Sequence, residues 1–194
     1  MAETLSSDAL ITWDRLKAEL ETSGFFDSDD RDRGIRFINA VSRRANSITR
    51  RKLKSRTYTD ATFDGTGDDH LVLPQYPVTA VSAVSVDITR AFAATAVLDS
   101  DDYEYDEDTG ILYIWIGTPK FKRCVRVTYT AGYVTAPDDL QDAIVQAVAY
   151  SWKKSVSKSF GVQSITGDGV TTQFEIDLPI PSMRIIESYK REPV

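Results

Sequence analysis

Residues 127–150 read Val-Thr-Tyr-Thr-Ala-Gly-Tyr-Val-Thr-Ala-Pro-Asp-Asp-Leu-Gln-Asp-Ala-Ile-Val-Gln-Ala-Val-Ala-Tyr, and the apolar residues change their period within this stretch. Its beginning continues the apolar–polar alternation of residues 124–130, which is typical of a half-buried strand. Pro137 with Asp138 and Asp139 is typical of a first helical turn, because proline needs no amide partner there and carboxylates favour the helix dipole. The segment therefore predicts a strand that leads into a long helix.

The predicted helix spans residues 137–157 and is apolar over most of its circumference. Its polar residues Asp142, Gln146 and Lys153 cover only a narrow arc. A helix with so little polar surface lies in the centre of a bundle or is sandwiched by a second chain. We therefore expect residues 137–157 to form the central helix of the fold.

Two earlier segments also have helical periodicity. Thr12 precedes apolar residues at helical spacing, so residues 12–22 are predicted as a helix capped by the Thr12 hydroxyl. Residues 30–53 are predicted as a second helix, with apolar residues at spacings of three and four. Its basic residues fall opposite the apolar arc and predict one continuous basic ridge: Arg33, Arg36, Arg43, Arg44, Arg50, Arg51 and Lys54.

The region between the second and third helices has the two-residue period of β-strands. Strands are predicted at residues 58–64, 70–73, 78–88, 103–106, 111–116 and 124–130. We predict an α+β fold: a small helical bundle of three main helices, with an antiparallel β insertion between helices 2 and 3 and an extended C-terminal arm. The predicted parts are 1–56, the N-terminal helices; 57–134, the β insertion; 135–160, the central helix; and 161–194, the arm with a short terminal helix at 182–189.

The composition excludes several classes of protein. The chain has 194 residues, of which 42% are hydrophobic and 27% charged, as in a folded protein long enough to bury a core. Cys124 and His70 are the only residues of their types, which excludes an internal disulfide and a Cys/His zinc site. No stretch approaches the roughly 20 apolar residues of a membrane span, and residues 1–7 lack a secretion-signal pattern, so we expect no membrane partner.

The net charge of −6 conceals a segregation of charge along the chain. Residues 33–59 hold nine basic residues and no acidic one, whereas residues 60–110 hold twelve acidic residues and one basic residue, Arg90. Such segregation bears on partners and assembly more than the net charge does. The sequence therefore predicts one basic and one acidic surface.

Several motifs suggest chemistry but fit turns better. Asp-Thr-Gly at 108–110 matches the tripeptide of aspartic proteases, yet it lies between two predicted strands, and we interpret it as a hairpin turn. The acidic run 99–108 lacks the spacing of a calcium loop, which favours a solvated or partner-facing surface over adventitious cation binding. The glycine pairs at 65–67 and 167–169 lack the setting of a phosphate loop. We expect no catalytic residue, no metal site and no cofactor.

The basic ridge on the helix 30–53 has three interpretations. It is a solvated outer face, a contact with an acidic protein patch, or a contact with DNA phosphates, whose neutralisation drives sequence-independent DNA affinity. No helix-turn-helix, RNP aromatic pair or zinc motif accompanies the ridge, so sequence-specific recognition is unsupported. A non-specific DNA-binding protein is the alternative function.

The segment 127–150 resembles the head–tail connector (head-completion adaptor) proteins of tailed bacteriophages and prophages. In that family a V-x-Y-x-A-G-Y strand leads through a proline and acidic residues into a long apolar helix. Other segments are similar to the family in the same order along the chain: the short helix 12–20, the long helix of 38–56 that ends in a basic segment before Arg-Thr-Tyr-Thr at 56–59, the Leu-Pro segment 73–87, and the proline and apolar helix of 179–191.

The resemblance implies a structural protein without enzyme activity. Such proteins form a homo-oligomeric ring, generally a dodecamer, that docks on the portal protein and meets a tail-side connector or tail terminator. DNA passes through the channel without sequence specificity. The expected location is the head–tail junction of the virion, with assembly in the host cytoplasm. Contacts with the portal, a neighbouring subunit or DNA are expected at Arg36, Arg43, Arg44, Arg50, Arg51, Lys54, Asp101, Asp102, Glu104, Ile185, Ile186 and Tyr189.

Overall fold

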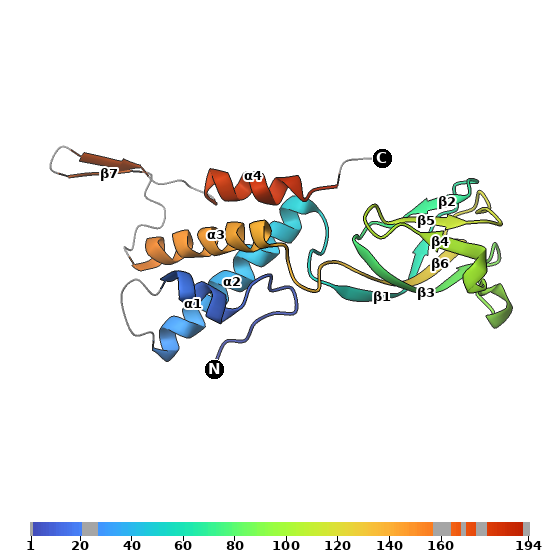
Figure 1. The fold of residues 1–194 in the computed structure, drawn as a ribbon, viewed down its shortest axis with the longest axis horizontal. Coiled ribbons are helices and arrows are strands. Elements are labelled where there is room, and N and C mark those ends of the chain that lie inside the picture. The colour runs from blue at the N-terminus through green and yellow to red at the C-terminus, as the bar shows by residue number, and fades with distance from the viewer. Residues whose placement is uncertain (1, 21–26, 157–163, 168–169, 174–177, 192–194) are drawn as a thin grey trace. The chain divides into compact units, whose positions relative to one another are not determined.

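Figure 1 shows the computed structural model, which describes residues 2–20, 27–156, 164–167, 170–173 and 178–191. The chain divides into a helical unit, Met1–Leu53 with Thr135–Val194, and a β unit, Lys54–Val134. The helical unit contains α1 (Trp13–Leu20), α2 (Ser28–Thr49), α3 (Asp138–Val156), β7 (Ser164–Gly167), β8 (Val170–Gln173) and α4 (Ile180–Ser188). The β unit contains β1 (Arg56–Phe63), β2 (His70–Val72), β3 (Val78–Val86), η1 (Ala94–Ala96), η2 (Ser100–Asp102), β4 (Tyr103–Tyr105), β5 (Ile111–Ile114) and β6 (Val125–Ala131). The predicted α+β class is confirmed.

Side-chain caps fix the starts of α1 and α2. Thr12 Oγ1 accepts a hydrogen bond from the Arg15 amide at 3.2 Å, as the sequence predicts. Asp27 Oδ1 accepts one from the Asp30 amide at 2.8 Å. These bonds satisfy amide groups that the first turn of a helix leaves without an intrahelical partner. The Asp27 cap explains why α2 begins at Ser28 rather than near Asp30.

The helix α3 is the central helix of its unit, as predicted. It packs against α1, α2 and α4, and Figure 1 shows it between α1 and α4. Buried residues cover much of its circumference, whereas Asp142, Gln146 and Lys153 of the polar arc are exposed. The buried side chains of α3 are Leu140, Ala143, Ile144, Val145, Ala147, Val148, Trp152 and Lys154.

The helix α2 ends at Thr49, earlier than the predicted end at Leu53. Arg50 adopts a left-handed conformation with φ 57°, and its amide donates to the Ser47 carbonyl at 3.4 Å, which closes the helix. Asn46 Oδ1 then accepts a hydrogen bond from the Leu53 amide at 3.0 Å and holds the departing chain. The basic residues after Arg50 therefore lie off the helix, and the predicted continuous ridge is wrong in this part.

The β unit consists of two antiparallel sheets in place of the single sheet predicted. Their strand orders are β1-β6-β3 and β2-β5-β4. The central strand of the first sheet is β6, so the stretch 127–150 joins the middle of that sheet to α3. In the helical unit, β7 and β8 form a further antiparallel pair within the predicted C-terminal arm.

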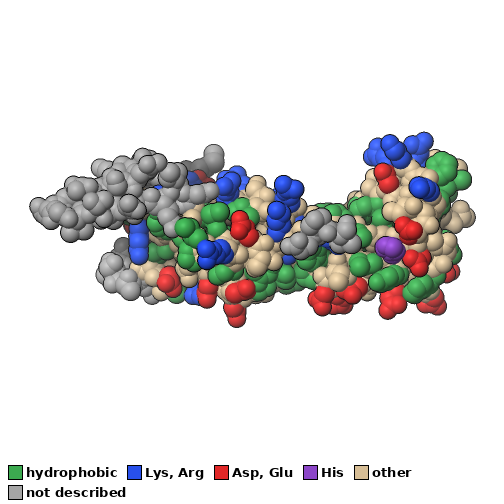
Figure 2. All heavy atoms as spheres, turned by 90° about the horizontal axis from the view of Figure 1, so that it is seen from above, with side chains coloured by type: hydrophobic (Ala, Val, Ile, Leu, Met, Phe, Trp, Pro, Cys, Tyr) green, Lys and Arg blue, Asp and Glu red, His purple; other side chains and the backbone are tan. Residues whose placement is uncertain are grey.

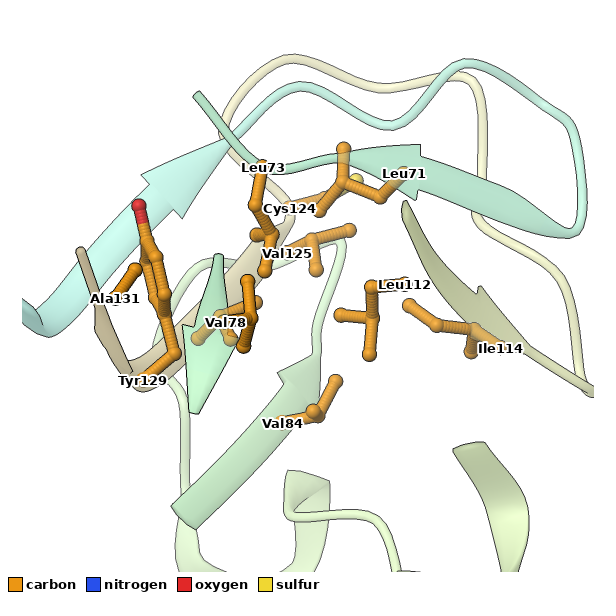
Figure 3. Packing of buried hydrophobic residues seen from close by; sticks show 11 residues of the cluster. Leu71, Leu73, Val78, Val84, Leu112, Ile114, Cys124, Val125, Tyr129 and Ala131 are labelled. Atoms are coloured by element: carbon orange, nitrogen blue, oxygen red, sulfur yellow. The ribbon is translucent and has the colours of Figure 1, made fainter. Parts of the chain in front are cut away.

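Both sheets of the β unit contribute to one hydrophobic core (Figure 3). Tyr129 is 1% exposed and its ring stacks on Tyr58, with 5.0 Å between ring centroids. Burial raises the pKa of Tyr129 well above its ordinary value, because the phenolate would lose its hydration. Cys124 is fully buried and is a core residue. The core also includes Leu71, Leu73, Val78, Val84, Leu112, Ile114, Val125, Val127 and Ala131.

The tripeptide at 108–110 belongs to the hairpin turn between β4 and β5, which confirms its interpretation as a turn. The Asp106 carboxylate accepts hydrogen bonds from the amides of Asp108 at 3.0 Å and Thr109 at 2.9 Å. Gly110 has φ +68°, a conformation that glycine adopts without strain. Within the described ranges, no helix is long and apolar enough to cross a membrane. Nor does that part of the chain bring together three His, Cys, Asp or Glu side chains able to hold a metal ion.

Candidate assembly surfaces

One face of α2, together with the residue that caps its C-terminal end, carries the first candidate surface, which we call the arginine face: Arg36, Arg43 and Arg44 on the helix and Arg50 at the cap. All four side chains are exposed. The opposite face of α2 is buried, so packing fixes the direction in which the arginines point. That buried face consists of Ile35, Ile38, Val41, Ser42, Ala45 and Asn46.

A cleft of about 590 Å³ opens beside Arg36 and Arg43, with Phe37 and Ala40 among its lining residues. The N-terminal segment forms part of this lining, because it is held along α2 by Asn39. The Asn39 amide group donates to the Thr4 carbonyl at 2.9 Å, and its oxygen accepts from the Ser6 amide at 2.9 Å. The cleft therefore presents two guanidinium groups beside apolar side-chain surface, and one of them, that of Arg36, is paired with the Glu3 carboxylate at 3.7 Å.

Two residues of the predicted ridge do not belong to this face. Arg51 is only 4% exposed, so its side chain lies within the fold. Lys54 belongs to the β unit, where its ammonium group donates to the Val134 carbonyl at 2.7 Å. A third ridge residue, Arg33, packs its guanidinium over the Trp152 ring at 5.6 Å from the centroid. The prediction of an exposed ridge therefore does not extend to Arg51 or Lys54.

The predicted acidic residues lie on the β unit. Asp101 and Glu104 are exposed. Asp102 also has a structural role, since its carboxylate accepts from the Asp99 amide at 3.3 Å and caps the short helix η2. In the sheet β2-β5-β4, Glu104 is the exposed residue of β4 and pairs with Tyr113 of β5, and Asp102 and Asp106 flank that strand at its two ends.

The same side of this sheet carries two aromatic residues that are not among the predicted contact residues. Tyr113 is 36% exposed and Trp115 is 57% exposed, and their rings stack with centroids 6.5 Å apart and planes 14° apart. Tyr113 lies directly opposite His70 on β2 and Glu104 on β4. The Trp115 amide donates to the Asp102 carbonyl at 2.9 Å. We call Tyr113 and Trp115, with Asp102, Glu104 and Asp106, the aromatic–acidic face.

Figure 2 shows acidic and hydrophobic side chains next to the single histidine side chain. A sequence signal for the face exists in residues 111–116. Leu112 and Ile114 are fully buried, so the alternation in this strand points Tyr113 and Trp115 outward. The aromatic residues could therefore be found from the two-residue period once the strand was assigned.

The C-terminal helix α4 holds the remaining predicted contact residues. Ile186 is fully buried within the helical unit, where α4 packs on α3 and α2, so its side chain is not available to a neighbour. Ile185 is partly exposed. The Tyr189 hydroxyl donates to Asp139 Oδ1 at 2.5 Å and ties the end of α4 to the start of α3. The interface prediction does not extend to Ile186.

The fold and the two surfaces define an α+β protein that exposes charged side chains on one unit and stacked aromatic side chains beside carboxylates on the other. The chain belongs to the head completion protein family, whose family model matches residues 19–192. Membership of this family makes it a structural component of phage particles and not an enzyme. No curated protein matches this chain in sequence.

Solved structures with a similar fold come from particles of a gene transfer agent (GTA). A chain from the neck of the empty particle, computed with C6 symmetry, is 18% identical with a TM-score of 0.62; the match covers 99% of this chain and 94% of that chain. A chain from the virion of the native particle is 20% identical, with a TM-score of 0.61 and the same coverage. A chain from the neck of the native particle, computed with C12 symmetry, is 18% identical, again with a TM-score of 0.61 and that coverage. The fold is thus shared along nearly the whole chain.

Proposed function

We propose that the protein forms a ring at the head–tail junction of a phage or prophage particle, where it docks on the portal protein and extends the DNA channel toward the tail. One observation carries the proposal: the match to the head completion family covers residues 19–192. The likeness of the whole fold to chains from GTA necks supports it further. One of those necks was computed with C12 symmetry, which supports a dodecamer. The tail-side connector or tail terminator is the second partner.

A closed ring requires a heterologous interface, in which one patch of a subunit meets a different patch of the next. The arginine face and the aromatic–acidic face are two different patches of opposite charge, located on the helical unit and on the β unit. Exposed ion pairs contribute only about 0–1 kcal/mol each, so charge sets orientation while apolar contact supplies most of the affinity. Ile185 and the exposed aromatic residues are candidates for that apolar contact.

DNA then passes through the channel without a sequence-specific contact. The net charge of −6 fits a channel component that lets DNA slide. The alternative of a free DNA-binding protein loses its main support, because Arg51 is buried and Lys54 lies off α2, which leaves a shorter basic face. Free binding to DNA phosphates would also fall steeply as the salt concentration rises.

Mass photometry and electron microscopy of the protein, with and without its portal protein, test the proposal. We expect a ring on the portal, and retention of free duplex DNA that is weak at physiological salt. A protein that binds duplex DNA tightly at low salt, and forms no ring with the portal, would favour the alternative function. A protein that does neither would overturn both.

A further inference from the structure

We propose that the aromatic–acidic face of one subunit docks into the arginine-lined cleft on α2 of the neighbouring subunit. This inference rests on the proposed function, because it assigns the two surfaces that meet in the ring. The occupant of each surface is a second copy of this chain. The contact is heterologous, so each copy uses both surfaces and the contacts can close a ring.

The aromatic–acidic face has the composition of an interface centre. Trp115 is 57% exposed and is therefore available to a partner. Tryptophan and tyrosine side chains contribute much of the binding free energy at protein–protein interfaces. The stacking of Tyr113 on Trp115 and the hydrogen bond from the Trp115 amide to the Asp102 carbonyl hold the aromatic surface in place. Little side-chain freedom is therefore lost when a partner covers it, which lowers the cost of association.

The neighbourhood of these rings is acidic. Glu104 lies directly opposite Tyr113 in the sheet, and Asp102 lies beside Trp115. Asp69, beside His70 on the other side of Tyr113, adds a further exposed carboxylate, 74% exposed. A partner for this face therefore has to bring positive charge together with apolar surface.

The cleft on α2 offers that combination. Arg36 and Arg43 line it together with Glu3, Phe37 and Ala40, and its volume of about 590 Å³ leaves ample room for an aromatic side chain. A guanidinium group binds a carboxylate through paired hydrogen bonds and also stacks on an aromatic ring. Arginine side chains in the cleft can therefore bind both the carboxylates and the aromatic rings of the aromatic–acidic face. Lysine side chains would do this less well, because an ammonium group lacks the planar shape of a guanidinium group.

A charge exchange tests the docking on the full-length protein. Glu104→Arg and Arg43→Glu each place like charges across the proposed contact, so each single variant should raise the concentration needed for ring assembly on the portal by about tenfold. The double variant E104R/R43E restores opposite charges and should recover most of that loss. Trp115→Ala should weaken assembly at least as much, because it removes apolar contact.

Matched controls are Glu107→Arg and Arg184→Glu, which reverse exposed charges outside the two faces. They should assemble like the original protein. Circular dichroism should show that every variant is folded.

If the original protein forms rings and the single variants assemble equally well, the docking fails while the proposed function stands. Single variants that lose assembly without recovery in the double variant also overturn the pairing. If the original protein forms no ring, the proposed function itself fails.

Discussion

The helical unit and the β unit bury their apolar residues in different ways. The helical unit surrounds one apolar helix, α3, with α1, α2 and α4, so few large apolar side chains are left for a partner. The β unit buries only the inner faces of its sheets. Its outer surface keeps several large side chains exposed: Tyr113, Trp115, Ile116 and Phe121.

The two units therefore differ in the surface that they offer to a partner. The interior of the helical unit is closed by its own helices, and its outer surface contributes charge through the arginine face. The β unit leaves apolar surface uncovered, and contiguous exposed apolar surface marks interaction sites. We therefore expect stability and partner binding to depend on different residues, which substitutions in each unit can separate.

The largest expected effect comes from the centre of the helical unit. Ile144→Ala removes a fully buried side chain of α3 and should lower the free energy of unfolding by about 4 kcal/mol, within the range for large-to-small changes in a core. Chemical denaturation followed by helical circular dichroism measures it. The control Gln146→Ala changes an exposed position of the same helix and should stay within about 0.5 kcal/mol. Equal effects at the two positions would contradict the central role of α3.

In the β unit, a large effect on stability is expected at Gly65, where another segment of the chain passes close to the backbone. A Cβ at Gly65 would lie 1.9 Å from the Pro119 carbonyl oxygen and 2.7 Å from Cys124 Sγ. Gly65→Ala should therefore cost about 3 kcal/mol, the upper part of the range for overpacking. Thermal unfolding monitored through Trp115, the only tryptophan of this unit, measures the change.

The nearby Gly67 is the matched control for Gly65. Its φ is +93°, and the nearest atom to an added Cβ is Lys120 Cβ at 3.6 Å. Gly67→Ala should therefore cost only the backbone strain, about 1 kcal/mol. A Gly67 variant as damaged as the Gly65 variant would show that backbone conformation, and not close packing, limits this loop.

The sequence predicts the helical unit better than the β unit for a physical reason. Helix periodicity and capping are local, so Thr12, Pro137 and the apolar residues of α3 specify their helices without distant contacts. Sheet membership depends on which distant strands pair. The pairing of β6 with both β1 and β3, and the separate sheet β2-β5-β4, cannot be deduced from alternation alone.

The candidate surfaces also depend on tertiary contacts that local sequence patterns do not specify. A helical wheel correctly orients Arg36, Arg43 and Arg44, but it assumes that α2 continues past Thr49. The left-handed Arg50 ends the helix, and Arg51 turns inward as a result. Arginine gives no sequence signal for such a helix end, where glycine is the usual residue. The cleft beside α2 depends on the N-terminal segment that Asn39 holds, which is a tertiary contact.

A smaller effect on stability is expected at the C-terminal end of α2, and it tests whether stability and partner binding can be separated within the helical unit. Arg50→Gly relieves the left-handed strain and should stabilise the helical unit by about 1 kcal/mol. Ser47→Gly, in the last turn of the same helix, should destabilise it by about 0.5 kcal/mol. Thermal unfolding followed by helical circular dichroism distinguishes the two signs. The Arg50 variant also removes one arginine of the arginine face, so a more stable protein with weaker ring assembly would separate stability from partner binding directly.

The smallest effect is the pH dependence that two carboxylates give to the β unit. Hydrogen bonds from Thr89 lower the pKa of Asp87, and hydrogen bonds from Thr109 lower the pKa of Asp106, both below the ordinary value of 3.8. A carboxylate with a lowered pKa in the folded state stabilises that state above the ordinary pKa and loses this contribution as the pH falls through the folded-state pKa. The β unit should therefore weaken as acid protonates these two groups below pH 3.8, and Asp87→Asn with Asp106→Asn should flatten that part of the pH profile. NMR titration of the carboxyl carbons measures the two pKa values, and ordinary values at both residues would contradict the structural role of the two turns.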